Sequence, residues 1–388
     1  MVPNSILKEF NQRFDGSPTH YIRSPGRINL IGEHIDYCGG LVMPMAINQS
    51  IHGWYRFNQS SQINVYSEQF GQQVAINPLD VAQKPCGQWR DYPQGILRLG
   101  VHRQLAKGFD LYIRSDIDAG GLSSSASLLA MMSLINHQAL TGEVLALGAR
   151  GERLSLALLC QQAENQFVGV PSGIMDPVSV LIGGAIVLAC QTLKFEQLKA
   201  LPPDYCFVVM DTRVPRTLAS SGYAQRVDEI QQIKSILGEK IPAGGLALCP
   251  EAEIVNCLDK LTDPSLNRRA RHIFSEQRRV KQAADAINAD DLEQFGQLMQ
   301  DSHRSLQRDY EVSCPELDLI CSLSKSSGLS LGARMTGAGF GGCAISLIRT
   351  RDARSHASLV KNRYMAETGL EPRLITCEPA TGTQIIEL

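Results

Sequence analysis

The 388-residue sequence lacks an excess of charge, a long apolar run and a secretory segment. Its 37 basic and 39 acidic residues leave a net charge of −2, so no global field attracts nucleic acid or an anionic membrane. The longest apolar run, residues 178–190, has about 13 residues, whereas a membrane helix needs roughly 20. The first twenty residues are charged and contain no apolar core segment. We therefore expect a cytoplasmic protein that binds neither nucleic acid nor membrane.

Cysteine and histidine patterns typical of metal sites are also absent. The eleven cysteines are scattered without a C-x-x-C, and neither H-E-x-x-H nor a paired Cys/His spacing occurs. This pattern favours free buried thiols in a reducing compartment over a metal centre. The most basic stretch, residues 267–281, is interrupted by Glu276 and by apolar residues. It is more typical of a solvated helix face than of a site for a polyanion.

Length and local patterns predict two domains of the α+β class. A chain of 388 residues suits two domains at roughly 100 to 200 residues each. The Leu-Pro-Pro at 201–203 precedes a strand-like run, so we place the domains at 1–200 and 201–388. The run 178–190 is interpreted as a buried strand or helix. Strands are expected at 20–23, 51–57, 63–67, 111–114, 205–211, 333–336 and 343–348, and helices at 125–140, 154–167, 224–237, 268–299 and 315–324.

The first motif with chemical meaning is residues 118–126 (DAGGLSSSA), directly before an apolar helix. The unpaired N–H groups and the positive dipole end of a helix N-terminus attract anions, and glycine lets a phosphate approach the backbone. Plain N-capping by serine is the alternative. One serine would suffice for a cap, so three serines after a glycine pair favour phosphate. The Walker pattern is absent, which excludes a P-loop site.

A second motif, residues 336–342 (TGAGFGG), formally satisfies G-x-G-x-x-G. A dinucleotide fingerprint must open a helix, whereas another strand-like run follows here. We therefore predict a glycine-rich hairpin, which either lies against a ligand or forms a tight structural turn.

A third motif, residues 25–37, brings Arg27, Glu33, His34 and Asp36 into one glycine-rich loop. Four such side chains could form a salt-bridged surface turn. They also have the chemistry of a sugar site, in which carboxylates and imidazole bind hydroxyls and a guanidinium meets phosphate charge.

Together these segments resemble the GHMP small-molecule kinase superfamily, and the third motif resembles the galactokinase signature. The resemblance extends over five segments in the family's order, PGRINLIGEHIDYCGG, GGLSSSAS, GVPSGIMD, LASSGY and RMTGAGFGGC. It implies an N-terminal domain like ribosomal protein S5 domain 2 and a ferredoxin-like C-terminal domain. It also implies transfer of the γ-phosphate of ATP to the anomeric hydroxyl of galactose.

The resemblance assigns roles to residues of this chain. It implies that Asp176 is the catalytic carboxylate and Arg27 its partner, and that Ser124 or Ser125 holds Mg²⁺ with Glu164. Asp176 followed by Pro177 also fits a helix N-cap with proline at the first helical position. The implied sugar-binding set is Arg27, Glu33, His34, Asp36, Gly173, Asp176 and Tyr223, and the implied phosphate loop is Gly120, Gly121, Leu122, Ser123, Ser124, Ser125 and Ala126.

Several positions depart from the galactokinase pattern and bear on the sugar. They are Ile35, Cys38, Pro171, Ser172, Pro177, Gly222 and Ala224. Kinases for galacturonate, arabinose or N-acetylgalactosamine are therefore alternatives, and a non-catalytic galactose sensor is another. The full-length serine loop argues against the sensor. The glutamate at position 33 is similar to the galactokinase pattern and not to the galacturonokinase pattern, which argues for a neutral hexose. The sequence leaves the oligomeric state open, with a monomer plausible.

Overall fold

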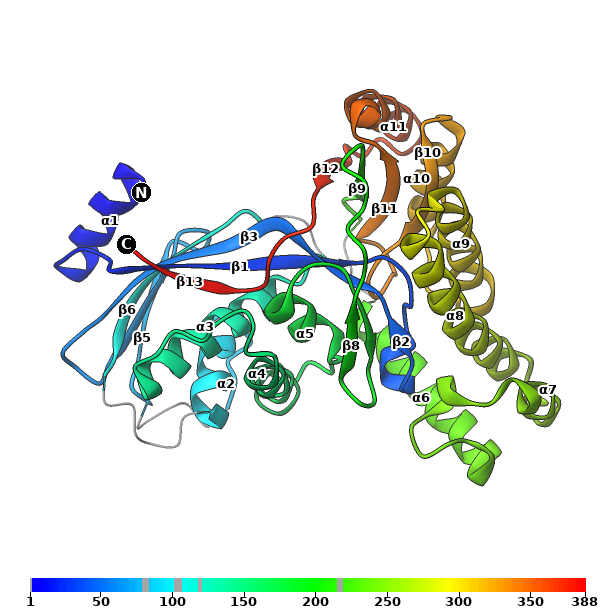
Figure 1. The fold of residues 1–388 in the computed structure, drawn as a ribbon, viewed down its shortest axis with the longest axis horizontal. Helices are drawn as coiled ribbons and strands as arrows, with labels where there is room; N and C mark the ends of the chain where they lie inside the picture. Colours follow the sequence, from blue (N-terminus) through cyan, green and yellow to red (C-terminus); the bar gives the residue numbers. More distant parts are fainter. Residues whose placement is uncertain (1, 79–83, 101–106, 118–120, 215–218) are drawn as a thin grey trace.

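The computed structural model describes residues 2–78, 84–100, 107–117, 121–214 and 219–388. A six-stranded, mostly antiparallel sheet forms its N-terminal half (Figure 1). The strands lie in the order β13 (Gln384–Glu387), β1 (His20–Asn29), β3 (Pro44–Phe57), β6 (Phe109–Ser115), β4 (Ile63–Ser67) and β5 (Gln72–Ile76).

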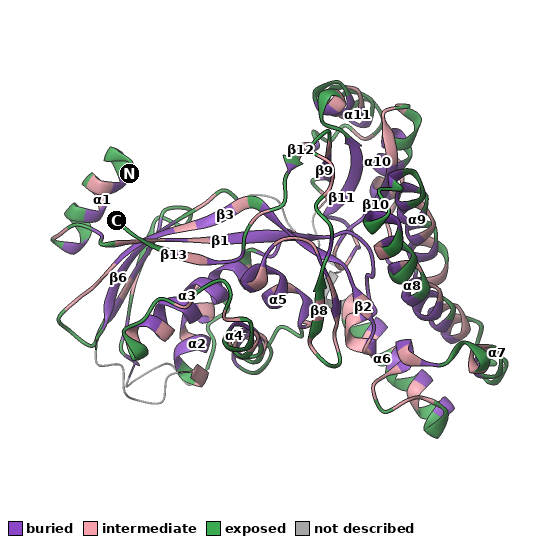
Figure 2. Cartoon of the chain, in the orientation of Figure 1, coloured by how far each residue is buried: buried purple, intermediate pink, exposed green. Residues whose placement is uncertain are grey.

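One face of this sheet carries most of the helices of this half. Figure 1 shows α2 (Asp91–Gly100), α3 (Ser124–Thr141), α4 (Arg150–Gln162) and α5 (Met175–Ile182) below the sheet and α1 (Asn4–Phe14) above it. Helix α3 is apolar almost all round because it lies between the sheet and the other helices, and its side chains are buried over most of its length (Figure 2). A small sheet of β2 (Leu41–Val42), β7 (Ile186–Ala189) and β8 (Lys194–Gln197) continues this half.

The C-terminal half is built on a four-stranded antiparallel sheet. Its strands lie in the order β10 (Ser330–Met335), β11 (Cys343–Arg349), β9 (Tyr205–Asp211) and β12 (Arg373–Cys377). The helices of this half are α6 (Ala219–Leu237), α7 (Glu251–Lys260), α8 (Pro264–Asn288), α9 (Leu292–Ser305), α10 (Pro315–Ser326) and α11 (Ala353–Thr368). Helices α9 and α10 pack against β10, and α8 packs against α9.

Short 3₁₀ and π turns join these elements. The 3₁₀ turns are Asp36–Cys38, Gly238–Lys240, Leu246–Leu248 and Thr350–Asp352, and the π turns are Ala163–Val168 and Leu306–Tyr310. The last strand, β13, returns to pair antiparallel with β1, so the end of the chain belongs to the first sheet. The division at residue 200 stays a prediction. In the part of the chain that the structure describes, no helix has the length and apolarity needed to span a membrane.

Most expected elements are present, with different ends. Strands 63–67 and 205–211 match β4 and β9, and residues 336–342 form the hairpin loop between β10 and β11. The run 178–190 is both a helix end and a strand, since it contains the last turn of α5 and then β7. The mixture of helices and strands confirms the α+β class.

One helix prediction was wrong, and the helices α1, α2, α7 and α11 were missed. Residues 268–299 form two helices, because Asp290 has a left-handed φ of 59° and Asp291 caps α9 by accepting from the N–H of Gln294 at 3.0 Å. Helix α1 was not predicted. Its apolar side chains Ile6, Phe10 and Phe14 pack with aromatic residues of the sheet, a contact that the local pattern does not report.

Candidate active site

The centre of the candidate site is a bidentate ion pair between Arg27 on β1 and Asp176 on α5. Arg27 donates from Nε to Oδ1 of Asp176 at 2.7 Å and from Nη2 to Oδ2 at 2.6 Å. Its third nitrogen, Nη1, donates to the carbonyl of Gly121 at 2.6 Å. Parallel charge-assisted bonds of this kind fix both distance and orientation. The N-cap interpretation of Asp176 was wrong, because Ile174 is the cap residue of α5 and Asp176 lies inside its first turn.

The serine loop leads directly into α3. Ser123 occupies the N-cap position, but its side chain makes no capping hydrogen bond. Ser124 is exposed and Ser125 is partly exposed, whereas the side chains of Leu122 and Ala126 are buried in the core. The first turn of α3 therefore keeps its N–H groups without a side-chain cap, as an anion site requires. Gly120 lies outside the described residues.

Glu164 lies beside this loop, in the π turn that follows α4. Burial raises the pKa of its carboxyl, and hydrogen bonds from Ser172 and Ser125 oppose the rise. Ser125 and Glu164 therefore come together from two different helices. Mg²⁺ commonly takes one or two carboxylates and fills its other positions with phosphate oxygens and water, so this hydroxyl and carboxylate fit such an ion. Among the described residues, no group of three or more His, Cys, Asp or Glu side chains could hold a metal by itself.

Arg27 and Asp176 line a cavity of about 360 Å³. The cavity is lined by every residue that the resemblance assigned to sugar binding. These residues come from the signature loop, from α5 and the segment before it, and from the start of α6. The lining residues are Arg27, Glu33, His34, Asp36, Gly121, Glu164, Val170, Pro171, Ser172, Gly173, Met175, Asp176, Tyr223, Gly337 and Ala338.

Two carboxylates in the wall are held in different ways. Glu33 is buried, accepts from the guanidinium of Arg334, and accepts from the N–H of Gly337 at 3.1 Å. Burial raises the pKa of Glu33, and Arg334 opposes that rise. In the part of the chain that the structure describes, Asp36 has no such cation beside it. Burial, with the charge of Asp176 nearby, raises the pKa of Asp36 to about 6.

Gly173 supplies the space that Asp36 occupies. A Cβ on Gly173 would lie 1.7 Å from Oδ2 of Asp36, so any other residue at this position would displace the carboxylate. The glycine thus acts on the wall of the cavity through its lack of a side chain.

His34 is neutral, and both of its ring nitrogens have protein partners. Its Nε2–H donates to the carbonyl of Ala338 at 3.1 Å, so its Nδ1 accepts from the hydroxyl of Tyr37 at 2.9 Å. Tyr37 in turn accepts from the hydroxyl of Tyr310 at 2.8 Å. Burial lowers the pKa of His34 to about 3. In this state His34 links the signature loop to the hairpin loop that contains Ala338.

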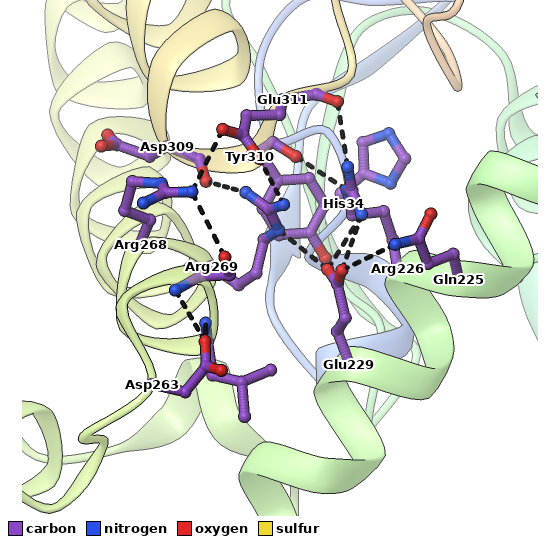
Figure 3. Close-up of polar contacts among 12 residues, drawn as sticks. His34, Gln225, Arg226, Glu229, Asp263, Arg268, Arg269, Asp309, Tyr310 and Glu311 are labelled. Carbon is purple, nitrogen blue, oxygen red and sulfur yellow. Dashed lines mark hydrogen bonds and ion pairs between the residues drawn. The ribbon is translucent and has the colours of Figure 1, made fainter.

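Tyr223 lines the same cavity and lies near the start of α6. Its ring centre is 5.7 Å from that of His34 and 5.5 Å from that of Tyr37. One turn later, Arg226 donates to the carbonyl of Tyr310 at 2.8 Å and to that of Glu311 at 3.1 Å. Figure 3 shows the polar network that continues from Arg226 through Glu229 to Arg269 on α8.

Sequence reasoning missed four residues that support this cavity: Tyr37, Arg226, Tyr310 and Arg334. Tyr37 and Arg334 belong to the quoted motifs, and a buried arginine beside a carboxylate-rich loop was a signal that could have been used. Arg226 and Tyr310 lie outside the motifs, and only the contact between α6 and the second π turn identifies them.

Three family models match this chain. The galactokinase galactose-binding signature matches residues 8–56, the GHMP kinase N-terminal domain matches residues 91–184, and the GHMP kinase C-terminal domain matches residues 283–364. A mevalonate kinase from Methanococcus jannaschii has a similar fold, with a TM-score of 0.64 at 20% identity over 94% of this chain and 99% of that chain. The fold and the site together define a two-domain GHMP kinase, an ATP-dependent phosphotransferase.

The relatives define the family more narrowly. Galactokinases of Lactococcus lactis subsp. lactis and Exiguobacterium sibiricum are 35% and 36% identical, each over 396 aligned positions that cover 100% of this chain and 98% and 99% of theirs. The crystal structure of Lactococcus lactis galactokinase complexed with galactose has a TM-score of 0.90 at 34% identity and covers 99% of both chains. The chain belongs to the galactokinase family.

Proposed function

We propose that this protein transfers the γ-phosphate of ATP to the anomeric hydroxyl of galactose. The observation that carries the proposal is the Arg27–Asp176 pair at one wall of the cavity. The sugar-binding signature forms a second wall, and the uncapped N-terminus of α3 is adjacent. An acceptor hydroxyl placed at Asp176 would therefore lie near phosphates placed at α3.

Asp176 orients the hydroxyl first and accepts its proton second. In a loose phosphoryl-transfer transition state the attacking hydroxyl is little deprotonated early, so positioning and neutralisation of charge dominate. Arg27 holds the carboxylate in one orientation and adds positive charge beside the transferred group.

Ser125 and Glu164 would hold Mg²⁺, with the first turn of α3 around the phosphates of ATP. When bound, the ion neutralises negative charge on the phosphate oxygens. The chain supplies one hydroxyl and one carboxylate near the catalytic pair, so the nucleotide must bring the remaining oxygen ligands.

Galactose is the sugar that the cavity favours. Glu33, Asp36 and Tyr223 offer acceptors and a ring face to a neutral hexose, and Arg334 already neutralises Glu33. A uronate would bring an unpaired negative charge beside Asp36. We expect the reaction to take place in the cytoplasm, where ATP is available.

The test is a phosphorylation screen with ATP and Mg²⁺, read by ADP release, with the product identified by phosphorus NMR. Galactose should give the highest kcat/KM among galactose, galacturonate, arabinose and N-acetylgalactosamine. A higher kcat/KM for another sugar would contradict the specificity. Binding of galactose without ADP release would instead support a sensor.

A further inference from the structure

Ser123 has a backbone conformation that its residue type rarely adopts. Its φ of 61° and ψ of 48° lie in the left-handed region, where a side chain crowds the backbone and glycine is favoured. Serine at an N-cap usually offsets such a cost by binding the first turn of its helix. Ser123 makes no such bond.

The Ser123 hydroxyl is directed at the catalytic carboxylate instead. Its Oγ donates to Oδ2 of Asp176, and the residue is only 8% exposed. Two residues earlier, Gly121 accepts from the same arginine that binds Asp176. The serine loop is thus attached to the Arg27–Asp176 pair at two points.

Counting acceptor positions shows what this contact does to Asp176. An ionised carboxylate has about four, two on each oxygen. Among the described residues, Oδ2 accepts from Arg27 Nη2 and from Ser123, whereas Oδ1 accepts from Arg27 Nε alone. The remaining acceptor position is on Oδ1.

We propose that Ser123 is a positioning residue that occupies Oδ2 and leaves Oδ1 of Asp176 for the anomeric hydroxyl. The proposal rests on the proposed kinase function and deepens it. It also gives Ser123 a different task from the phosphate contact that the sequence implied. Without the hydroxyl, a sugar could bond to either oxygen, and only one of the two geometries is aligned with the phosphate.

The test compares Ser123→Ala with Ser123→Gly. Both lack the hydroxyl, but only alanine keeps a Cβ in the left-handed region. We expect kcat to fall about 10- to 100-fold in both, as for loss of a hydrogen bond to a charged group in the transition state. KM for galactose and for ATP should stay within about threefold. Ser123→Asn, which tolerates this φ and offers an N–H donor, should recover part of kcat.

Ser155→Ala is the matched control, because Ser155 is an exposed helical serine whose hydroxyl bonds only to the carbonyl of Gly151 among the contacts described. It should have wild-type kinetics. Thermal melts verify that each variant is folded, and glycine should fold at least as well as serine at this φ.

Three results would overturn the proposal. A raised KM for ATP with unchanged kcat would make Ser123 a phosphate ligand. A defect in the alanine variant that is absent from the glycine variant would assign the effect to backbone conformation. Wild-type kcat in both Ser123→Ala and Ser123→Gly would show that Ser123 does not position Asp176. Absence of sugar phosphorylation by the wild type would overturn the kinase function itself, a separate result.

Discussion

At the scale of single residues, most charged and polar groups of the cavity wall have protein partners, whereas Asp36 can change its protonation state near pH 6. Arg27, Glu33 and His34 have protein partners, whereas Asp36 is partly buried and forms no ion pair among the described residues. Asp176 is paired but keeps an open acceptor position. The chemistry of the site should therefore be sensitive to Asp176 and Asp36 in different ways.

For Asp176→Asn, we expect galactose and ATP to bind nearly as before while kcat falls about 100-fold or more. The amide keeps the shape of the carboxylate but loses the charge and the capacity to accept a proton, which act mainly in the transition state. Single-turnover kinetics with calorimetry would separate the two effects. Wild-type turnover in this variant would contradict the catalytic assignment.

For Asp36, we expect galactose affinity to weaken as the pH falls through about 6. In the proposed site the ionised carboxylate would accept from sugar hydroxyls, and its pKa of about 6 means that it gains a proton below that pH. His34, with a pKa of about 3, stays neutral over this range. Calorimetry between pH 5 and 7.5 is the measurement.

The control for this dependence is Asp36→Asn, which should bind galactose weakly and with little change over the same range. Equal affinity of the wild type at pH 5 and pH 7.5 would show that Asp36 does not titrate there, or that it does not contact the sugar.

At the scale of elements, a buried guanidinium of α6 itself attaches this helix to the second π turn. Arg226 follows Tyr223 by three residues and binds two carbonyls at the end of the π turn Leu306–Tyr310. The same turn carries the Tyr310 hydroxyl, which donates to the hydroxyl of Tyr37. Arg226 therefore sets the spacing between two walls of the cavity.

We expect Arg226→Lys to raise KM for galactose about tenfold while kcat changes less than threefold. Lysine cannot bridge two carbonyls with a planar fork, so Tyr223 loses its fixed distance from His34. KM for ATP should not change. The measurement is steady-state kinetics with each substrate varied in turn.

Arg268→Gln is the matched control for this variant. Arg268 reaches the Glu311 carboxylate and the Ser265 hydroxyl in the same network, and none of its described hydrogen bonds is to α6. An equal rise in KM in both variants would indicate a general loss of packing rather than the placement of Tyr223.

Helix α5 is held by Arg153, a buried arginine for which no carboxylate partner is described. Arg153 on α4 donates to the carbonyl of Leu181 at 2.6 Å, at the C-terminal end of α5, and to that of Thr383 at 2.8 Å. A cation at a helix C-terminus is favoured by the helix dipole. The helix that carries Asp176 is thereby tied to the segment before β13.

At the scale of the whole molecule, stability should depend on histidines that are buried in the neutral form. Burial lowers the pKa of His272 and of His356 to about 4 and that of His34 to about 3. In the unfolded chain these histidines take up protons once the pH falls below their ordinary pKa of about 6.5. In the folded chain they stay neutral until the pH reaches their lowered pKa values of about 3 to 4. Stability from these groups is therefore lost as the pH falls from about 6.5 toward 4.

His356→Gln tests the contribution of one such histidine to the pH dependence of stability. His356 does not line the cavity; it lies on α11 and hydrogen-bonds to Ser324 on α10. Between pH 7 and pH 5 the wild type should lose about 2 kcal/mol of unfolding free energy through His356, and the variant should lack that part. The other histidines contribute equally to both proteins. Urea unfolding at the two pH values gives the difference, and parallel losses would show that His356 is not the cause.

The sequence by itself determined the family, the mixed α+β class and the segments that form the site. The serine loop before an apolar helix predicted α3, and the strand-like runs predicted β4 and β9 with their ends, because these features depend on local spacing and side-chain type. The residues proposed to bind the sugar could be named by resemblance, and the structure brings them to one cavity.

The tertiary structure decided which groups meet. Arg27 and Asp176 are 149 positions apart and Glu33 and Arg334 are 301 positions apart, so no local pattern reports either pair. The hydroxyl of Ser123 could have capped α3, and only the approach of α5 directs it to Asp176. Local spacing reports how a segment folds, whereas the partners of a buried polar group depend on which distant segments the sheets bring together.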